Sequence, residues 1–309
     1  MTVCIAARAG NVILGTSDRM LTSGDVQFEP STGAKILGLT SSLFMMTAGD
    51  SGLQAEIFYL LYREITERIT RAPNNWVLIG DAADLYVSYY NAIRKKRAEN
   101  AILRPLYLDE NSYVTNQQGL NERLVSDISR ELLNFVMPNI SAIIAGIDPT
   151  GAHIYLIDRG RTNALETTCL DAVGFVAIGS GGRHASSQFM FARHAWNAPL
   201  ADTLFLSYYA KRKSEVAPGV GQGTDMVVVG PGLGTFTVLN ATVVEKLETE
   251  YKKVVKAEDR GFASAKVEIK GYVETLQRQA QTAAAGAQQQ PPPPATNGGA
   301  APVDEPTTK

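Results

Sequence analysis

The chain has 309 residues, of which 19% are charged, and its formal net charge is −2. This near-neutral balance argues against the basic surfaces that bind nucleic acid or anionic membranes. No apolar run reaches the length of about 20 residues that spans a bilayer. The first residues also lack the basic and apolar segments of a secretory signal. The sequence therefore predicts a cytoplasmic protein without nucleic-acid or membrane partners.

The cysteines and histidines give no sign of a metal site. Cys4 and Cys169 do not form a CxxC pair, and a cytosolic setting keeps such thiols reduced. The histidines at 153, 184 and 194 show no ligand spacing that joins them to acids or cysteines. We expect neither a metal nor another cofactor.

The composition changes near the C-terminus. From Ala283 onward the chain is rich in alanine, glutamine and proline and contains no aromatic residue. Such a segment cannot bury enough apolar surface to offset chain entropy, which predicts a disordered tail over residues 283–309. A Pro-rich binding motif is the less favoured interpretation. The preceding part, of about 280 residues, suits one large domain or two small ones. We expect a main domain over residues 1–260 and a helical extension over residues 261–282.

In chain order, the first half contains two strand pairs followed by two helices. Short β-prone segments flank tight turns near Gly10 and Ser41, as in hairpins. Apolar residues then recur at helical spacing behind Asp50 or Ser51, either of which can cap the helix, and Pro73 ends it. The predicted elements are strands 3–8, 11–16, 35–39 and 42–47, and helices 53–69 and 76–99.

The second half returns to strands after a region over 104–137 that is predicted as a loop followed by a short helix. Glycines at 230–234 lie between two strands with no helix directly after them, so they do not match a dinucleotide-binding loop. Strands that alternate with pairs of helices favour an α+β layered domain with antiparallel sheets. The predicted elements here are strands 140–147, 153–157, 174–178, 225–229 and 235–239, and helices 182–196, 199–215 and 241–257.

Thr2 carries the chemistry that the sequence suggests most directly. Removal of Met1 by methionine aminopeptidase is expected because the second residue is small, and Thr2 would then carry a hydroxyl and an α-amine. A neutral α-amine, with a pKa of about 7.7–8.0, can act as the general base for a hydroxyl nucleophile. Since Met-Thr is a very common start, this dipeptide by itself is weak evidence for catalysis.

Three further residues complete a candidate site. Lys35 opens an apolar strand, where its ammonium group would place a positive field beside the nucleophile. Asp18 would hold that lysine in place, and Gly49 precedes a helix, where an exposed N–H can stabilise an oxyanion. Each also has a purely structural interpretation: an exposed turn residue, an edge-strand lysine and a helix-entry glycine.

The order and spacing of these residues resemble the proteasome β-subunit family and its bacterial relatives. The matching features are MT-x(15)-D at the start, AKI around Lys35, TAGD before a helix, and the turn AIGSGG at residues 177–182. The resemblance covers roughly residues 2–60, 139–193 and 200–238. It rests on the combination of motifs in this order, because no single motif is specific.

This resemblance implies a four-layer αββα sandwich of two antiparallel sheets flanked by helices, N-terminal-nucleophile hydrolase chemistry and ring-like self-assembly. Because only Met1 precedes the threonine, no autocatalytic processing is expected. The site residues that the resemblance implies are Thr2 as nucleophile and base, Asp18 and Lys35 as its electrostatic partners, Gly49 as oxyanion donor, Ser180 as a hydrogen-bond partner near the amine, and Thr47 in the first specificity pocket.

One part of the chain departs from the family pattern. The family often places an Asp and a Ser, three residues apart, before the closing hairpin, where this chain has Val216 and Gly219. Ser214 and Glu215 are the neighbours that would have to substitute as supporting residues. Without a substitute the threonine amine would lose part of its orienting network, and slow or narrow activity would follow.

The sequence leaves three functions open. The first is a threonine endopeptidase that hydrolyses peptides or unfolded protein as a homo-oligomer; an ATPase partner would be natural, but no segment identifies one. The second keeps the threonine and acts on a small amide. The third is a non-catalytic assembly protein, which an intact set of Thr2, Asp18 and Lys35 opposes. Cys4 is a weaker nucleophile candidate, because it lies inside the first predicted strand without an amine beside it.

Overall fold

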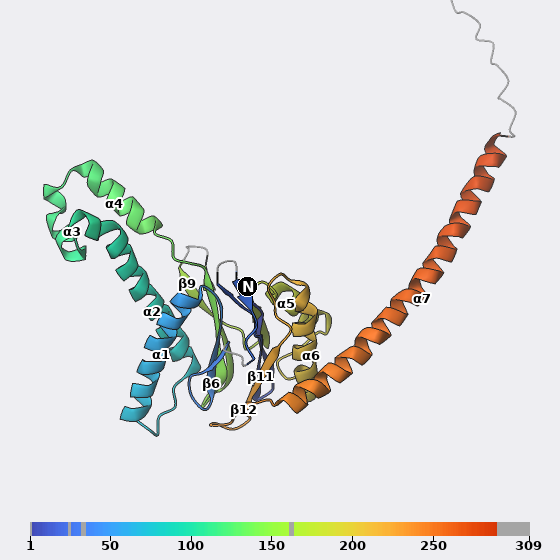
Figure 1. The fold of residues 1–309 in the computed structure, drawn as a ribbon, viewed down its shortest axis with the longest axis horizontal. Helices are drawn as coiled ribbons and strands as arrows, with labels where there is room; N and C mark the ends of the chain where they lie inside the picture. Colours follow the sequence, from blue (N-terminus) through green and yellow to red (C-terminus); the bar gives the residue numbers. More distant parts are fainter. Residues whose placement is uncertain (1, 24–25, 32–34, 161–163, 289–309) are drawn as a thin grey trace, which may run out of the picture. The chain divides into compact units, whose positions relative to one another are not determined.

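The computed structural model describes residues 2–23, 26–31, 35–160 and 164–288 (Figure 1). The chain divides into two compact units, Met1–Glu248 and Thr249–Lys309. The first unit thus ends at Glu248, whereas the sequence suggested a boundary after residue 260. This unit contains both large sheets and all the candidate site residues.

The first sheet has the N-terminal strand in its interior. Its antiparallel strands follow the order β10-β1-β2-β11-β12. Cys4 pairs with Ile178 on one side and with Ser17 on the other, so Thr2 enters the sheet between two neighbours. The strands are β1 (Cys4–Ala9), β2 (Val12–Asp18), β10 (Phe175–Ile178), β11 (Thr224–Val229) and β12 (Phe236–Val238).

The second sheet follows the order β5-β6-β7-β8-β9, also with antiparallel neighbours. A separate ribbon joins β3 (Leu21–Ser23) to β4 (Val26–Phe28). Strands β3, β4 and β9 were not predicted. β4 has only three residues, all of them exposed, and β9 is exposed after its first residue, so neither strand has a buried apolar face. The strands of this sheet are β5 (Ile36–Gly38), β6 (Leu43–Gly49), β7 (Ile140–Asp148), β8 (Gly151–Arg159) and β9 (Leu165–Cys169).

The helices begin where the sequence provides caps and apolar periodicity. Asp50 accepts a hydrogen bond from the Leu53 backbone nitrogen (2.7 Å) and starts α1. The region 104–137 contains two short helices, α3 and α4, and not a loop with one helix. The helices of the first unit are α1 (Ser51–Arg71), α2 (Ile79–Ala98) with a π-helical extension (Glu99–Leu103), α3 (Glu110–Asn116), α4 (Glu122–Asn134), α5 (Gly182–Phe191) and α6 (Leu200–Lys213).

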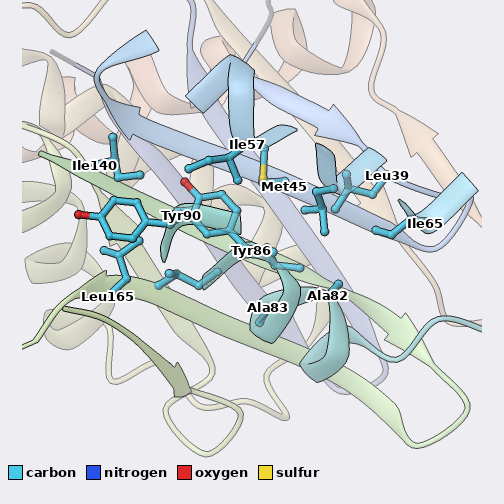
Figure 2. Packing of buried hydrophobic residues seen from close by; sticks show 14 of the residues in the cluster. Leu39, Met45, Ile57, Ile65, Ala82, Ala83, Tyr86, Tyr90, Ile140 and Leu165 are labelled. Atoms are coloured by element: carbon cyan, nitrogen blue, oxygen red, sulfur yellow. The ribbon is translucent and has the colours of Figure 1, made fainter. Parts of the chain in front are cut away.

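The two sheets pack face to face and are covered by helices on their outer faces, which confirms the predicted α+β sandwich (Figure 1). In β1 the alternation of side chains fills two layers. Cys4 and Ala6 lie in the core between the sheets, whereas Ile5 and Ala7 lie in the core beneath α5 and α6. On the other side, Tyr86 and its neighbours on α1 and α2 pack against the second sheet (Figure 2).

Helix α7 (Ala241–Gln288) begins in the first unit and forms the described part of the second. It joins the predicted helix 241–257 and the predicted helical extension 261–282 into one helix, and it continues through residues 283–288, which were predicted to belong to a disordered tail. Alanine and glutamine favour helix, which explains the extension. The rest of the predicted tail, 289–309, lies outside the described residues. Within the described ranges, no helix is both long and apolar enough to cross a membrane.

Candidate active site

In the structure, the Thr2 hydroxyl lies between the Asp18 carboxylate and the Lys35 ammonium group. Thr2 Oγ1 donates to Asp18 Oδ1 (2.6 Å), and the Lys35 ammonium donates to the same hydroxyl. Lys35 Nζ also lies 2.7 Å from Asp18 Oδ1. The three side chains are buried, and Asp18 is fully so, with 0% of its surface exposed. Thr2 lies two residues before β1, Asp18 ends β2, and Lys35 directly precedes β5.

Both oxygens of Asp18 are held by hydrogen bonds. Oδ1 also accepts from the Val3 backbone nitrogen (2.8 Å), while Oδ2 accepts from the Met20 and Gly221 backbone nitrogens (3.0 and 2.9 Å). Burial by itself raises the pKa of Asp18. The Lys35 charge and the hydrogen bonds from Lys35, Thr2 and Gly221 outweigh burial, so the pKa lies below its usual value. Asp18 is therefore an anion that orients its neighbours.

Ser180 meets the backbone of Thr2. The Thr2 nitrogen donates to Ser180 Oγ (3.2 Å), and Ser180 Oγ lies within hydrogen-bond distance of two carbonyl oxygens, those of Thr2 (3.4 Å) and Pro218 (3.2 Å). The preceding Gly179 has a φ of +89°, and a Cβ there would lie 2.2 Å from the Thr2 carbonyl oxygen. Only glycine allows this close approach.

Gly49 and Thr47 lie at the end of β6 on the opposite sheet. Both line a cavity of about 290 Å³ that also contains Thr2 and Lys35. Its other walls are largely apolar, with Leu37 from β5 and Phe58 from α1 among them. Thr47 and Thr2 therefore line the same cavity.

A second cavity, of about 560 Å³, is also lined by Thr2. It shares Thr2, Ala48 and Gly49 with the first cavity. Its remaining walls are more polar and include the charged residues Asp158 and Arg183. Thr2 therefore lines both cavities.

Cys4 does not compete with Thr2 as a nucleophile. Its thiol is fully buried and lies 3.6 Å from the Thr47 carbonyl oxygen. Burial raises the pKa of Cys4 to about 12, despite the opposing effect of the Lys35 charge. The thiol is consequently neutral at physiological pH, and a neutral thiol is a poor nucleophile.

The segment before the closing hairpin reaches the site with its backbone. Val216 is 74% exposed, and Gly219 has no side chain to offer. The two candidate substitutes bind elsewhere: Ser214 Oγ donates to the Lys211 carbonyl oxygen (2.6 Å), and Glu215 accepts from the Lys211 ammonium group (2.6 Å). Among the described contacts, neither of these side chains hydrogen-bonds to Thr2.

Two backbone groups of this segment contact site residues and were not predicted. They are the Pro218 carbonyl, which faces Ser180, and the Gly221 N–H, which binds Asp18. Because these are backbone groups, no side-chain motif marks them. The glycine-rich run over 219–223 was the available signal, since glycines allow a backbone to approach a buried side chain closely.

No cluster of three or more metal-binding side chains occurs among the described residues. The chain matches no protein-family model, and a search of curated proteins finds no match either.

Proposed function

We propose that the protein is a threonine-type endopeptidase of the N-terminal-nucleophile class, in which Thr2 acts after removal of Met1. One observation carries this proposal: the Thr2 hydroxyl touches both Lys35 and Asp18, and Thr2 lines two cavities. A structural threonine in a strand has no need of a buried cation at its hydroxyl. Burying the Lys35 charge is costly, so its position beside Thr2 calls for a functional explanation.

In the proposed reaction, Thr2 Oγ1 attacks the carbonyl carbon of the peptide bond and passes its proton to the free α-amine. The C–N bond then breaks, the departing amine takes that proton, and an ester between Thr2 and the acyl half remains. Water adds to the ester and releases the second product as a carboxylic acid. Neither an oxidant nor a cofactor is needed for any of these steps.

The surrounding groups have separate roles in this proposal. The Lys35 ammonium stabilises negative charge as it develops on the Thr2 oxygen, and Asp18 holds that ammonium. Ser180 orients the nitrogen that becomes the amine. Gly49 lines both cavities, where its N–H would face the oxyanion.

The two cavities favour a peptide over a small amide. A substrate that places its carbonyl carbon at Thr2 has room for side chains on both sides of the scissile bond. A small amide would leave one cavity unused. The apolar walls of the first cavity, formed by Leu37, Phe58 and their neighbours, suit an apolar side chain.

The resemblance to ring-forming proteases supports a further part of the proposal, a ring-like homo-oligomer in the cytoplasm. Light scattering coupled to gel filtration and electron microscopy of the purified full chain test the assembly, and cell fractionation tests the location. A monodisperse monomer that hydrolyses peptides at full rate would remove the ring from the proposal and leave the chemistry intact.

The decisive experiment is covalent labelling of Thr2 by a β-lactone. Intact-mass measurement of the wild type should show loss of Met1 and addition of one β-lactone. Thr2→Ser should retain labelling and Thr2→Ala should lose it, together with hydrolysis of fluorogenic peptides. Equal labelling of wild type and Thr2→Ala, or retention of Met1 in protein that hydrolyses peptides, would rule out the mechanism. Turnover of small amides without turnover of peptides would favour an amidohydrolase.

A further inference from the structure

We propose that Lys211, together with Glu215, is a positioning residue for the Thr2 site, because it clamps the two ends of the segment that binds Asp18 and Ser180. This inference rests on the proposed function for its kinetic test, although the clamp itself can be measured independently. The segment in question, called the clamp loop below, comprises residues 214–223.

Lys211 is a lysine with no exposed surface, near the C-terminus of α6. Its ammonium group donates to Glu215 Oε1 (2.6 Å) at the start of the clamp loop. It also donates to the Gln222 carbonyl oxygen (2.7 Å) near the end of that loop. A single cation therefore ties together two points that are separated by the rest of the loop.

Between these two points lie the backbone groups that touch the site. The Pro218 carbonyl faces Ser180 Oγ (3.2 Å), and the Gly221 N–H binds Asp18 Oδ2 (2.9 Å). Gly221 directly precedes the residue whose carbonyl Lys211 holds. Movement at Gln222 would therefore pull the Gly221 N–H away from Asp18 and loosen the carboxylate that orients Lys35.

A role in packing alone does not explain this arrangement. Burial pushes the pKa of Lys211 below its usual value, and the Glu215 carboxylate only partly offsets the effect. Replacing a buried ion pair by apolar side chains is often neutral or stabilising. An apolar pair would fill the same space, but it could not bind the Gln222 carbonyl. The ammonium group supplies a directional contact that fixes the loop.

Lys211 itself lines neither of the cavities at Thr2. A positioning role therefore predicts a loss in kcat with KM unchanged. For Lys211→Met we expect about a 100-fold fall in kcat and in the β-lactone labelling rate, the size of loss that a misplacement of about 1 Å produces. Lys211→Arg, which keeps the charge and the donors, should recover part of both rates.

A second variant guards against loss of folding. Lys211→Met combined with Glu215→Leu replaces the ion pair by apolar groups and leaves no buried charge unpaired. We expect this double variant to melt near the wild-type temperature and still to label slowly. Lys95→Met is the control for loss of a lysine charge, because it removes an exposed Lys–Glu pair, with Glu110, on helices that carry no site residue.

Hydrogen exchange of the full chain, followed by mass spectrometry, measures the clamp without any substrate. In Lys211→Met and in the double variant, exchange over residues 214–223 should accelerate while β6 and β7 keep their protection. Unchanged exchange over this loop would overturn the inference. Labelling at the wild-type rate in a folded double variant would also overturn it, as would a change in KM with kcat unchanged. If the wild type is not labelled at Thr2, the proposed function fails and the exchange result decides the clamp by itself.

Discussion

Lys35 Nζ lies 2.7 Å from Asp18 Oδ1, and this buried ion pair has the Thr2 hydroxyl as a shared partner of both charges. The pair joins the two sheets, because Asp18 ends β2 of the first sheet and Lys35 directly precedes β5 of the second. The backbone donors of Val3, Met20 and Gly221 fix the carboxylate from other directions. The position of the ammonium is therefore set by the fold and not by the flexible lysine side chain.

Removal of the cation tests this relationship. Lys35→Met leaves the Asp18 carboxylate buried without its countercharge, which should lower the free energy of unfolding by about 3–5 kcal/mol. The β-lactone labelling rate of Thr2 should fall by about 100-fold or more, because charge on the attacking oxygen is no longer stabilised. Chemical denaturation and mass spectrometry measure the two effects. Lys35→Arg is the control, because it keeps the charge and changes the geometry of the donor group. If folded Lys35→Met is labelled at the wild-type rate, Lys35 has no catalytic role.

The lowered pKa of Asp18 predicts how stability depends on pH. The folded pKa lies below the unfolded value of about 3.9, so the stabilisation by Asp18 is fully present above that value. It is lost as pH falls through the folded pKa. The difference in unfolding free energy between wild type and Asp18→Asn should stay constant from about pH 6 to 8 and shrink below about pH 4. A difference that grows on acidification would contradict the assignment.

Thiol reagents should distinguish the two cysteines. Cys4 is buried with a pKa raised to about 12, whereas Cys169 is exposed. We expect iodoacetamide at pH 8 to modify native wild type at Cys169 alone and to leave native Cys169→Ser unmodified, while denatured Cys169→Ser reacts at Cys4. Peptide mapping identifies the sites. Rapid modification of Cys4 in the native protein would show that the thiol is accessible and would revive it as a nucleophile.

Gly179 offers a test of the close approach to Thr2. Gly179→Ala places a Cβ where it would meet the Thr2 carbonyl oxygen at 2.2 Å, in addition to the strain of a φ of +89°. Gly10→Ala is the matched control, since its φ of +63° is also positive but a Cβ there meets nothing within 4 Å. Both variants should lose about 1–2 kcal/mol to the left-handed conformation. Gly179→Ala should lose more than this and should also lose β-lactone labelling, whereas equal behaviour of the two variants would contradict a packing role for Gly179.

The layered fold could be predicted because its elements have a clear periodicity of apolar residues and are bounded by turn and capping residues. The strand pair around Gly10 and the helix behind Asp50 follow from turn chemistry, capping and the spacing of apolar residues. Elements without a buried face were missed, as β9 and β4 illustrate. Only one short helix was predicted in the region where α3 and α4 lie, because these two helices form a small core of their own around Tyr113 and Ile128, which only the folded chain assembles.

The sequence by itself determined which side chains were available for chemistry: Thr2, Asp18, Lys35 and Ser180, in an order that resembles a known hydrolase family. Only the tertiary structure decided that Ser214 and Glu215 bind Lys211 and make no direct hydrogen bond to Thr2 among the described contacts. It also decided that the Gly221 N–H and the Pro218 carbonyl complete the site. The physical reason is that almost every residue carries a backbone N–H and a carbonyl group. Their use therefore depends on where the folded chain places them and not on the identity of the side chain.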